Sequence, residues 1–302
     1  MKDRFNLILW GASYDYDRYF HYIEIEKRKG NIIIEGIALN EENFAQEIDG
    51  IPVIEPNQII YMLYDYIVVL TKDTYSMILQ IAPILKIPRE KIITIELFQL
   101  PLFDFVRWNE VRTRKVSILS NHCWGGMTYE ALQMPFYSPL VGMYESDEDY
   151  IKLLGNLKHY LTCTLKCLEW IAVGDKRYPV VQCDDIVLRM NHHFGEWEQI
   201  VEKWKRRSAR LQESQIFATM YVNDKKILEQ FLKLPYKNKL VFTTIYSEDS
   251  QVIWMDIEYL EKKYGQNIFN APLEQAVIGR REFTRYDILG YLLGERKYKR
   301  IR

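Results

Sequence analysis

Short apolar runs rich in Ile, Leu and Val recur through the first hundred residues and alternate with helical patterns. Residues 6–12, 31–39 and 66–70 have the length and composition of strands that are buried on both faces. A fourth strand is expected over residues 91–97. Between the first two runs, apolar side chains recur at helical spacing, at Tyr16, Tyr19, Phe20 and Ile23. Strands that alternate with helices form parallel sheets, because each crossover helix brings the chain back to the end of the sheet at which the previous strand began. The sequence therefore predicts a Rossmann-like parallel-sheet domain over residues 1–105.

The loop after the first expected strand is where such a sheet would bind a dinucleotide, since ligands bind at the carboxyl ends of parallel strands. A dinucleotide fingerprint requires three glycines, and residues 10–15 contain only Gly11. Asp15 also places negative charge where a phosphate would dock. We therefore expect a Rossmann-like domain without a bound dinucleotide. The segments WGA, GIPV and YIVV together resemble the small N-terminal domains of sugar-modifying and polysaccharide-assembly enzymes.

A second α/β domain is expected over residues 106–302. Residues 101–114 contain a proline, scattered charges and no clean period, which is typical of a domain boundary. A new strand is expected at 116–120, followed by a glycine-containing loop and a helix. Further strands are expected at 178–183, 186–191, 216–222 and 240–245, and further helices at 150–168, 197–211 and 283–293.

Composition and charge exclude several classes of protein. The 302 residues are 48% hydrophobic and 27% charged, which is typical of a globular chain rather than a disordered or collagenous one. Forty basic residues balance 41 acidic ones, so we expect no nucleic-acid partner. Four cysteines make no disulfide framework, and no apolar run reaches the length of a membrane helix. A cytoplasmic location is therefore expected.

The C-terminal tail is strongly basic, with five charged side chains at Arg296, Lys297, Lys299, Arg300 and Arg302. A solvated chain terminus explains such a run. Alternatively, the tail contacts acidic lipid headgroups and gives the protein a peripheral membrane attachment. The sequence leaves both interpretations open.

The loop after the first strand of the second domain is a candidate phosphate site. Asn121, Gly125 and Gly126 would present backbone N–H groups to a phosphate at the end of that strand. Cys123 in the same loop is a candidate nucleophile, although its neighbour His122 need not face it. We expect Cys123 to be an accessible thiol at the mouth of the strand.

The helix expected at 197–211 carries three arginines within five residues, Arg206, Arg207 and Arg210. Guanidinium groups bind phosphate oxygens through paired N–H donors, so the three would form a clamp for a diphosphate. A structural interpretation stays open, since a helix dipole favours bases near the C-terminus and acids near the N-terminus. Trp197 and Trp204 lie seven residues apart on the apolar face, and we expect both to be structural.

Acid–base chemistry has candidates in His192, His193 and Asp185. Either histidine is a plausible general base near neutral pH. Neighbours in an extended chain point to opposite faces, so at most one of the two enters a site. Asp185 follows Asp184 between two expected strands, where adjacent acids either hold a divalent ion or form a tight turn.

The helix expected at 150–168 carries three potential metal ligands. His159, Cys163 and Cys167 share a helical face at spacings of four residues. No second His/Cys pair at ligand spacing follows, and structural zinc usually takes four ligands from two elements. We therefore predict no metal site, and the sequence assigns no cofactor.

Five segments of the second domain together match one known pattern: residues 120–126 (SNHCWGG), 137–139 (YSP), 192–193 (HH), 203–210 and 236–239 (YKNK). In combination they resemble a bacterial family, domain of unknown function 1919, whose members are often described as exopolysaccharide biosynthesis proteins. His122 and Lys205 each stand where an Asn is expected. The resemblance covers residues 116–245 and implies a role in surface-polysaccharide assembly.

The combined expectation is an enzyme that transfers a sugar or a substituent from a phosphate-bearing donor, such as a nucleotide sugar, to a glycan acceptor. The alternative is a non-catalytic protein that binds a nucleotide sugar or glycan, or acts as a scaffold. The lone Gly11 and the lack of a strong catalytic motif favour this alternative. A turnover assay separates the two, because only the enzyme consumes donor when an acceptor is present.

Overall fold

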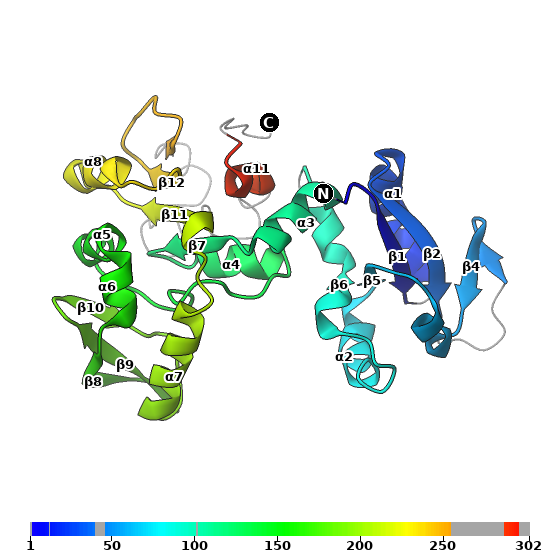
Figure 1. Cartoon of the computed structure of the whole chain (residues 1–302), viewed down its shortest axis with the longest axis horizontal. Coiled ribbons are helices and arrows are strands. Elements are labelled where there is room, and N and C mark those ends of the chain that lie inside the picture. Colours follow the sequence, from blue (N-terminus) through cyan, green and yellow to red (C-terminus); the bar gives the residue numbers. More distant parts are fainter. Residues whose placement is uncertain (1, 12, 40–45, 101, 255–286, 296–302) are drawn as a thin grey trace. The chain divides into compact units, whose positions relative to one another are not determined.

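The computed structural model of the chain describes residues 2–11, 13–39, 46–100, 102–254 and 287–295 (Figure 1). The basic tail at residues 296–302 lies outside this range, as does the first part of the helix expected at 283–293. The chain forms two compact units, residues 1–110 with 131–133 and residues 111–130 with 134–302. Both units are mixed α/β structures built on parallel strands, as the alternation of strands and helices predicts.

The first unit contains a six-stranded sheet in the order β3-β4-β2-β1-β5-β6. Neighbouring strands are parallel except β3, which is antiparallel to β4. The order of strands along the chain reverses between β1 and β5, where open parallel sheets bind ligands. The strands are β1 (Phe5–Trp10), β2 (Ile32–Ala38), β3 (Glu47–Ile48), β4 (Ile51–Ile54), β5 (Tyr66–Val69) and β6 (Ile92–Thr94).

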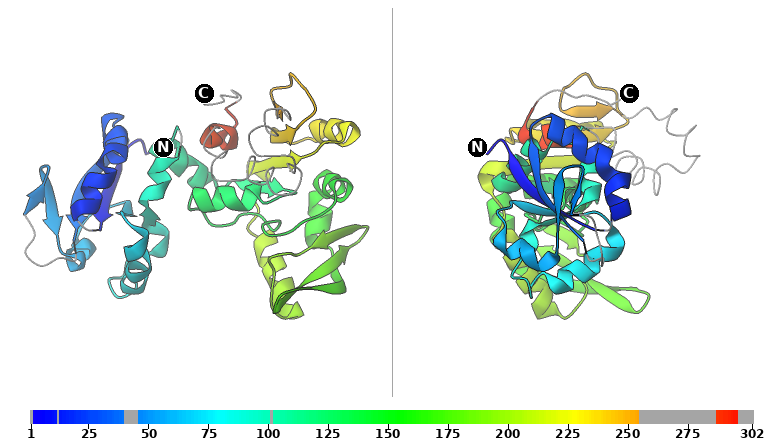
Figure 2. Two further views of the ribbon diagram at one scale, coloured as in Figure 1. Left: turned by 180° about the vertical axis from the view of Figure 1, so that it is seen from behind. Right: turned by 90° about the vertical axis from the view of Figure 1, so that its right-hand side faces the viewer.

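Helices cover both faces of this sheet (Figure 2). Ile59 and Ile78, from η1 and α2, pack with Ile8 and Trp10 of β1 in one core cluster, so η1 and α2 share a face. Helix α1 covers the other face and is followed by Gly30, whose φ of +79° favours glycine. The elements are α1 (Ser13–Arg28), α2 (Lys72–Ile81), η1 (Pro56–Tyr61), η2 (Arg89–Lys91) and η3 (Ile95–Gln99).

The bounds of one expected strand were wrong. The strand expected over residues 91–97 ends at Thr94 and continues as the 3-10 segment η3. The stretch at 101–114, where a domain boundary was expected, contains the helix α3 (Phe105–Arg114), and the division between the two units falls at residues 110–111. Phe105, Trp108 and Val111 are buried at spacings of three residues, which is a short apolar helical stripe among charged residues.

The second unit contains a four-stranded parallel sheet in the order β13-β12-β11-β7 and a three-stranded antiparallel sheet in the order β10-β9-β8. Its strands are β7 (Ser117–Ser120), β8 (Leu165–Val173), β9 (Lys176–Cys183), β10 (Ile186–Arg189), β11 (Ile216–Tyr221), β12 (Asn238–Thr243) and β13 (Val252–Trp254). Its helices are α4 (Trp124–Ala131), α5 (Asp147–Gly155), α6 (Leu157–Thr162), α7 (Trp197–Ser208), α8 (Lys225–Lys233) and α11 (Ile288–Leu293), with η4 (Glu213–Gln215).

The long helix expected over residues 150–168 was wrong. The chain forms α5, turns at Asn156, forms α6 and then enters strand β8. Cys163 forms a disulfide with Cys183 at the end of β9, although no disulfide was expected. His159 and Cys167 therefore lie on different elements and do not share a helical face. Within the described ranges, no helix has the length and apolar character needed to cross a membrane.

Candidate functional site

The backbone of Val141 connects two of the predicted site residues. Its carbonyl oxygen accepts a hydrogen bond from Nη1 of Arg207 at 2.8 Å and lies 3.1 Å from Nε2 of His193. Its side chain lies against α4, where a Cβ on Gly126 would be 3.1 Å from Cγ1 of Val141. Because these contacts meet at one residue, α4, α7 and the chain after β10 converge on a single place in the second unit.

The next residue, Gly142, positions His192. Gly142 has a φ of +79°, and a Cβ there would lie 2.9 Å from Cβ of His192. The His192 N–H donates to the Gly142 carbonyl at 3.0 Å, while the His192 side chain is exposed. Both the backbone conformation at position 142 and this close contact therefore require a glycine there. The chain turns here instead of continuing as a strand, since the His193 N–H donates to the Met190 carbonyl at 2.8 Å. The two histidines nevertheless differ, with His193 buried and His192 exposed.

Lys203 and Arg207 form the most strongly electropositive part of this site. They lie one helical turn apart on α7, where side chains four residues apart are neighbours, and both are partly buried. Neither makes an ion pair with any residue that the structure describes. Burial lowers the pKa of both groups, and repulsion from neighbouring cations lowers them further. The Arg207 guanidinium also lies 5.3 Å from the centre of the Phe136 ring, which helps to hold it in place.

His193 is fully buried beside these cations. Burial lowers its pKa to about 4, with further contributions from the charges of Lys203 and Arg207, while its contact with Val141 acts in the opposite direction. Nδ1 is buried and has no hydrogen-bond partner among the described residues. His193 is therefore neutral at pH 7. Its role as a general base stays a prediction, but a pKa this low makes for a weak base near neutral pH.

The other two arginines of the expected clamp lie on the exposed side of α7. Nη1 of Arg206 is 3.8 Å from Oε1 of Glu202, an ion pair between two exposed side chains. Arg210 is also exposed. Of the three arginines, Arg207 is the one that the structure brings to His193, and it does so together with Lys203. Lys203 was not among the residues of the expected clamp, although its spacing of four residues from Arg207 is a usable signal.

Asn121 acts as a link between elements. Its side chain donates to Oδ1 of Asp147 at 3.0 Å, and its Oδ1 accepts from the Tyr221 N–H at 3.2 Å. Asn121 is buried, so these bonds tie the end of β7 to α5 and β11. A Cβ on Gly125 would lie 3.1 Å from Cβ of Ser120 and 3.3 Å from the Ile118 side chain. Close packing of α4 on β7 therefore explains this glycine without a phosphate.

Cys123 is exposed and lies immediately before α4, as expected for a thiol at the mouth of β7. Its neighbour His122 turns towards the protein. The His122 Nδ1 accepts from the Trp124 N–H at 3.1 Å, and the ring lies edge-on to Phe242. Burial lowers the pKa of His122 to about 3, so this histidine is neutral at pH 7.

Asp185 lies away from the two histidines. It occupies the turn before β10, whereas His192 and His193 follow the other end of that strand. Its carboxylate contacts Nζ of Lys152 at 2.9 Å and accepts from the Tyr160 hydroxyl at 2.6 Å, and both contacts lower its pKa. These contacts favour the turn interpretation of Asp185.

Asp184, the other acid of this turn, has a φ of +56° and pairs with Nε2 of His159 at 2.8 Å. Such a backbone conformation suits a tight turn, in which Asp is one of the better tolerated residues. No cluster of three or more potential metal-ligating side chains occurs within the described part of the chain.

Glu145 was not singled out by its sequence. Its side chain is fully buried, and neither carboxylate oxygen has a hydrogen-bond partner among the residues described. Burial, with smaller contributions from the neighbouring Asp149 and Asp147, raises its pKa to about 8. Nothing in the local sequence marks this residue, because its burial depends on the packing of distant segments.

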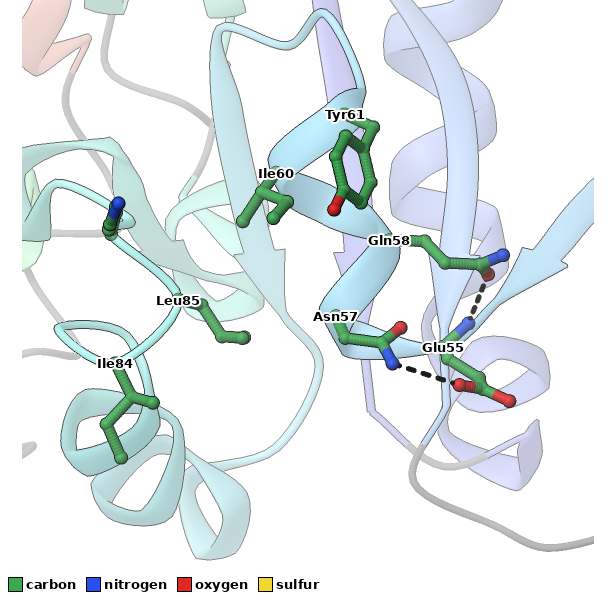
Figure 3. A pocket seen from close by; sticks show the side chains of 8 residues that line it. Glu55, Asn57, Gln58, Ile60, Tyr61, Ile84 and Leu85 are labelled. Atoms are coloured by element: carbon green, nitrogen blue, oxygen red, sulfur yellow. Dashed lines mark hydrogen bonds between the residues drawn. The ribbon is translucent and has the colours of Figure 1, made fainter.

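The first unit contains a surface groove of about 440 Å³ between η1 and the turn after α2 (Figure 3). No predicted site residue lines it. Its polar side chains are already used, since Gln58 accepts from the Glu55 N–H and Asn57 donates to the Glu55 carboxylate. The remaining lining is largely apolar and consists of Ile60, Tyr61, Ile84 and Leu85 with the stem of Lys86.

Comparisons with known sequences cover both units. Residues 95–289 match the domain of unknown function DUF1919, and residues 3–93 match the C2185-like N-terminal domain. The chain belongs to the DUF1919 family. The DUF1919 match includes Val141, His193, Lys203 and Arg207, so the whole electropositive site lies within the family domain.

A Haemophilus influenzae protein described as uncharacterized is 32% identical to this DUF1919 chain over 131 residues. The match covers 42% of this chain and 61% of the relative. The resemblance that the sequence motifs indicated is therefore confirmed at the level of the family.

Proposed function

We propose that this DUF1919 protein binds a phosphate-bearing small molecule, such as a nucleotide sugar, at Lys203 and Arg207. The observation that carries the proposal is the pair of partly buried cations with no carboxylate partner among the described residues. Like charges four residues apart on a helix destabilise it, and partial burial removes part of the water that would screen them. A bound anion would offset both effects.

Arg207 is arranged to act as an anion ligand without moving. Its Nη1 is held by the Val141 carbonyl and its plane packs near Phe136. A guanidinium has five N–H donors, so others remain available for phosphate oxygens. Lys203 supplies a second charge from the adjacent turn. Such preorganised cations stabilise the negative charge that develops on a diphosphate leaving group.

The proposed reaction is transfer of a sugar or substituent from this donor to a glycan acceptor, in the assembly of a bacterial surface polysaccharide. His192 is the better placed general base of the two histidines, because its side chain is exposed and adjoins the same segment. The motif resemblance to proteins described as exopolysaccharide biosynthesis proteins supports the setting. The exposed Cys123 before α4 is a further candidate for a nucleophile.

A non-catalytic binding or scaffold function is the second candidate. It is favoured by the separation of Asp185 from the histidines and by the neutral, buried state of His193. Both features leave the anion site without an evident acid–base pair. This candidate keeps anion binding at Lys203 and Arg207 but predicts no consumption of the donor.

For the first unit, we propose a Rossmann-like domain that does not bind a dinucleotide. Its parallel strands follow the order expected for a doubly wound sheet. A Cβ on Gly11 would lie 2.9 Å from Cβ of Leu70, so close packing already accounts for this glycine. The contact supports the interpretation of Gly11 as structural.

A turnover assay tests the transferase proposal. The full chain is incubated with uridine diphosphate sugars and an envelope glycan acceptor, and release of uridine diphosphate is measured. We expect release that requires acceptor, is lost in Arg207→Met and His192→Ala, and persists in Arg206→Met, in which an exposed arginine of the same helix is changed. Donor binding without any acceptor-dependent release would contradict the transferase and support the binding protein.

A further inference from the structure

A second, smaller pocket of about 260 Å³ lies beside the parallel sheet of the second unit. It opens at the amino ends of β11 and β12, beside the turn before β13 and the end of α11. This is the edge opposite to the carboxyl ends of the strands. The polar residues that line it include Lys237, Asn238, Asp249, Ser250 and Gln251.

The polar groups of this pocket are largely unused. The side chains of Lys237, Asn238, Ser250 and Gln251 make no hydrogen bond or ion pair with the residues that the structure describes. The groove in Figure 3 differs, since Asn57 there donates to the Glu55 carboxylate and Gln58 accepts from the Glu55 N–H. Polar groups that converge on a pocket fix the orientation and specificity of a ligand that binds there.

Lys239 shows which part of the YKNK motif is structural. Its ammonium donates to the carbonyl oxygens of Leu232 and Leu234, and it therefore satisfies the C-terminal end of α8. Lys239 is buried, and burial lowers its pKa. Packing accounts for Lys239 but not for Lys237 or Asn238, which remain available for a ligand.

Gly294 holds the Asn238 amide at the wall of the pocket. The residue ends α11 with a φ of +75°, and a Cβ there would lie 2.6 Å from Oδ1 of Asn238. The amide therefore lies directly against the glycine backbone, at a distance that no side chain would permit. This close contact fixes the amide without consuming its hydrogen-bonding capacity.

The charges around this pocket are balanced. Lys237 and Lys239 are matched by Asp249 and Glu295, in contrast to the excess of cations at Lys203 and Arg207. Amide, hydroxyl and carboxylate groups together offer both donors and acceptors, which is the pattern that hydroxyl groups of a neutral ligand require. The volume lies below the range of about 300–1,000 Å³ that is usual for drug-sized ligands, so it suits one small ring.

The geometry points to a binding site for a single neutral sugar unit in this pocket. Asn238 and Ser250 bond the sugar hydroxyl groups, and Lys237 donates to a ring or hydroxyl oxygen. The site is separate from the anion site at Lys203 and Arg207, and it stands whether the protein is a transferase or a binding protein.

Ligand-observed saturation-transfer NMR on the full chain tests this assignment. The probes are the methyl glycosides of glucose, galactose and mannose and free N-acetylglucosamine, with inorganic phosphate as the charged comparison. We expect at least one sugar to bind, with binding weakened about tenfold in Asn238→Ala, the effect of one lost hydrogen bond. Lys226→Met, which changes an exposed lysine of α8, should bind as the wild type does.

Two controls keep the result specific. Lys203→Met should leave sugar binding unchanged, so that failure of the anion site and failure of this site are distinguishable. Thermal unfolding of Asn238→Ala establishes that the variant is folded before its binding is compared. Absence of binding by all four sugars would overturn the assignment. Binding of phosphate that is lost in Lys237→Met would also overturn the assignment.

Discussion

Nη1 of Arg207 lies 3.3 Å from Nε2 of His193, and both atoms contact the carbonyl oxygen of Val141. Arginine has only donors and a carbonyl only accepts, so Nε2 can satisfy one of its two neighbours but not both. The other ring nitrogen, Nδ1, is buried without a partner among the described residues. The hydrogen-bonding capacity of the neutral His193 ring is therefore incompletely satisfied. A bound anion near Lys203 and Arg207 favours the protonated form of His193.

Anion affinity should therefore depend on pH through His193. Its pKa is about 4 without ligand, because burial and nearby cations oppose its charge. A bound anion reverses part of that effect and raises this pKa, so protons are taken up on binding. Affinity should increase as pH falls towards about 4, by up to about tenfold per pH unit for one linked proton between the pKa of the ligand-bound protein and that of the free protein. Sulfate is the suitable probe, since its own charge is constant over this range.

The variant His193→Gln should flatten this pH dependence, and His192→Gln should retain it. Calorimetric titration at several pH values measures both. An affinity for sulfate that is independent of pH in the wild type would contradict the role given to His193.

Glu145→Gln should stabilise the protein at neutral and alkaline pH. The folded-state pKa of Glu145 is about 8, above the ordinary value of 4.5, so the folded protein binds the proton more tightly than the unfolded chain. Its contribution to stability is present below about 4.5 and is lost as pH rises through about 8. At pH 8 and above, the variant should gain roughly 1–3 kcal/mol of unfolding free energy, because an amide carries no charge and so avoids the cost of ionising a buried carboxyl group. Denaturant unfolding at pH 5 and pH 9 measures the difference in unfolding free energy between the variant and the wild type. A variant that is equally destabilised at both pH values would contradict the prediction.

The two tryptophans of α7 should differ in their structural contribution. Trp204 is 2% exposed and belongs to the main core of the second unit, whereas Trp197 is only partly buried against it. Trp204→Ala should cost about 3–5 kcal/mol of unfolding free energy. Trp197→Ala should cost less. The reverse order in urea unfolding would show that the burial of these side chains does not determine their contributions.

The central strands of the two larger sheets, β1, β2, β5, β7, β11 and β12, were accessible from sequence because they read as continuous apolar runs. The short strands β3 and β13 were not expected. The segment at 150–168 differs from the single helix that its pattern predicts, for a physical reason. Its leucines have helical spacing, but Asn156 interrupts the helix, and Leu165 pairs with Cys183 in an antiparallel sheet. Such pairing depends on a strand that occurs later in the chain. Local periodicity cannot report it.

The candidate site was predictable only in part. Arg207 and His193 were identified by residue type, and their basic character follows from the sequence alone. Their convergence on Val141 was not accessible, because that residue lies 52 and 66 positions away along the chain. The same limit applies to Glu145, whose burial is a consequence of tertiary packing.

The central claim is that Lys203 and Arg207 bind a phosphate-bearing ligand, and calorimetric titration with uridine diphosphate tests it most directly. Lys203→Met and Arg207→Met are compared with Lys205→Met, which changes an exposed lysine of the same helix. We expect Lys203→Met and Arg207→Met to lose roughly 1.5–3 kcal/mol of binding free energy for uridine diphosphate, which raises Kd about 10- to 150-fold. We also expect wild-type affinity in Lys205→Met and no loss of thermal stability in Lys203→Met. Equal affinity in Lys203→Met, Arg207→Met and the wild type would contradict the account.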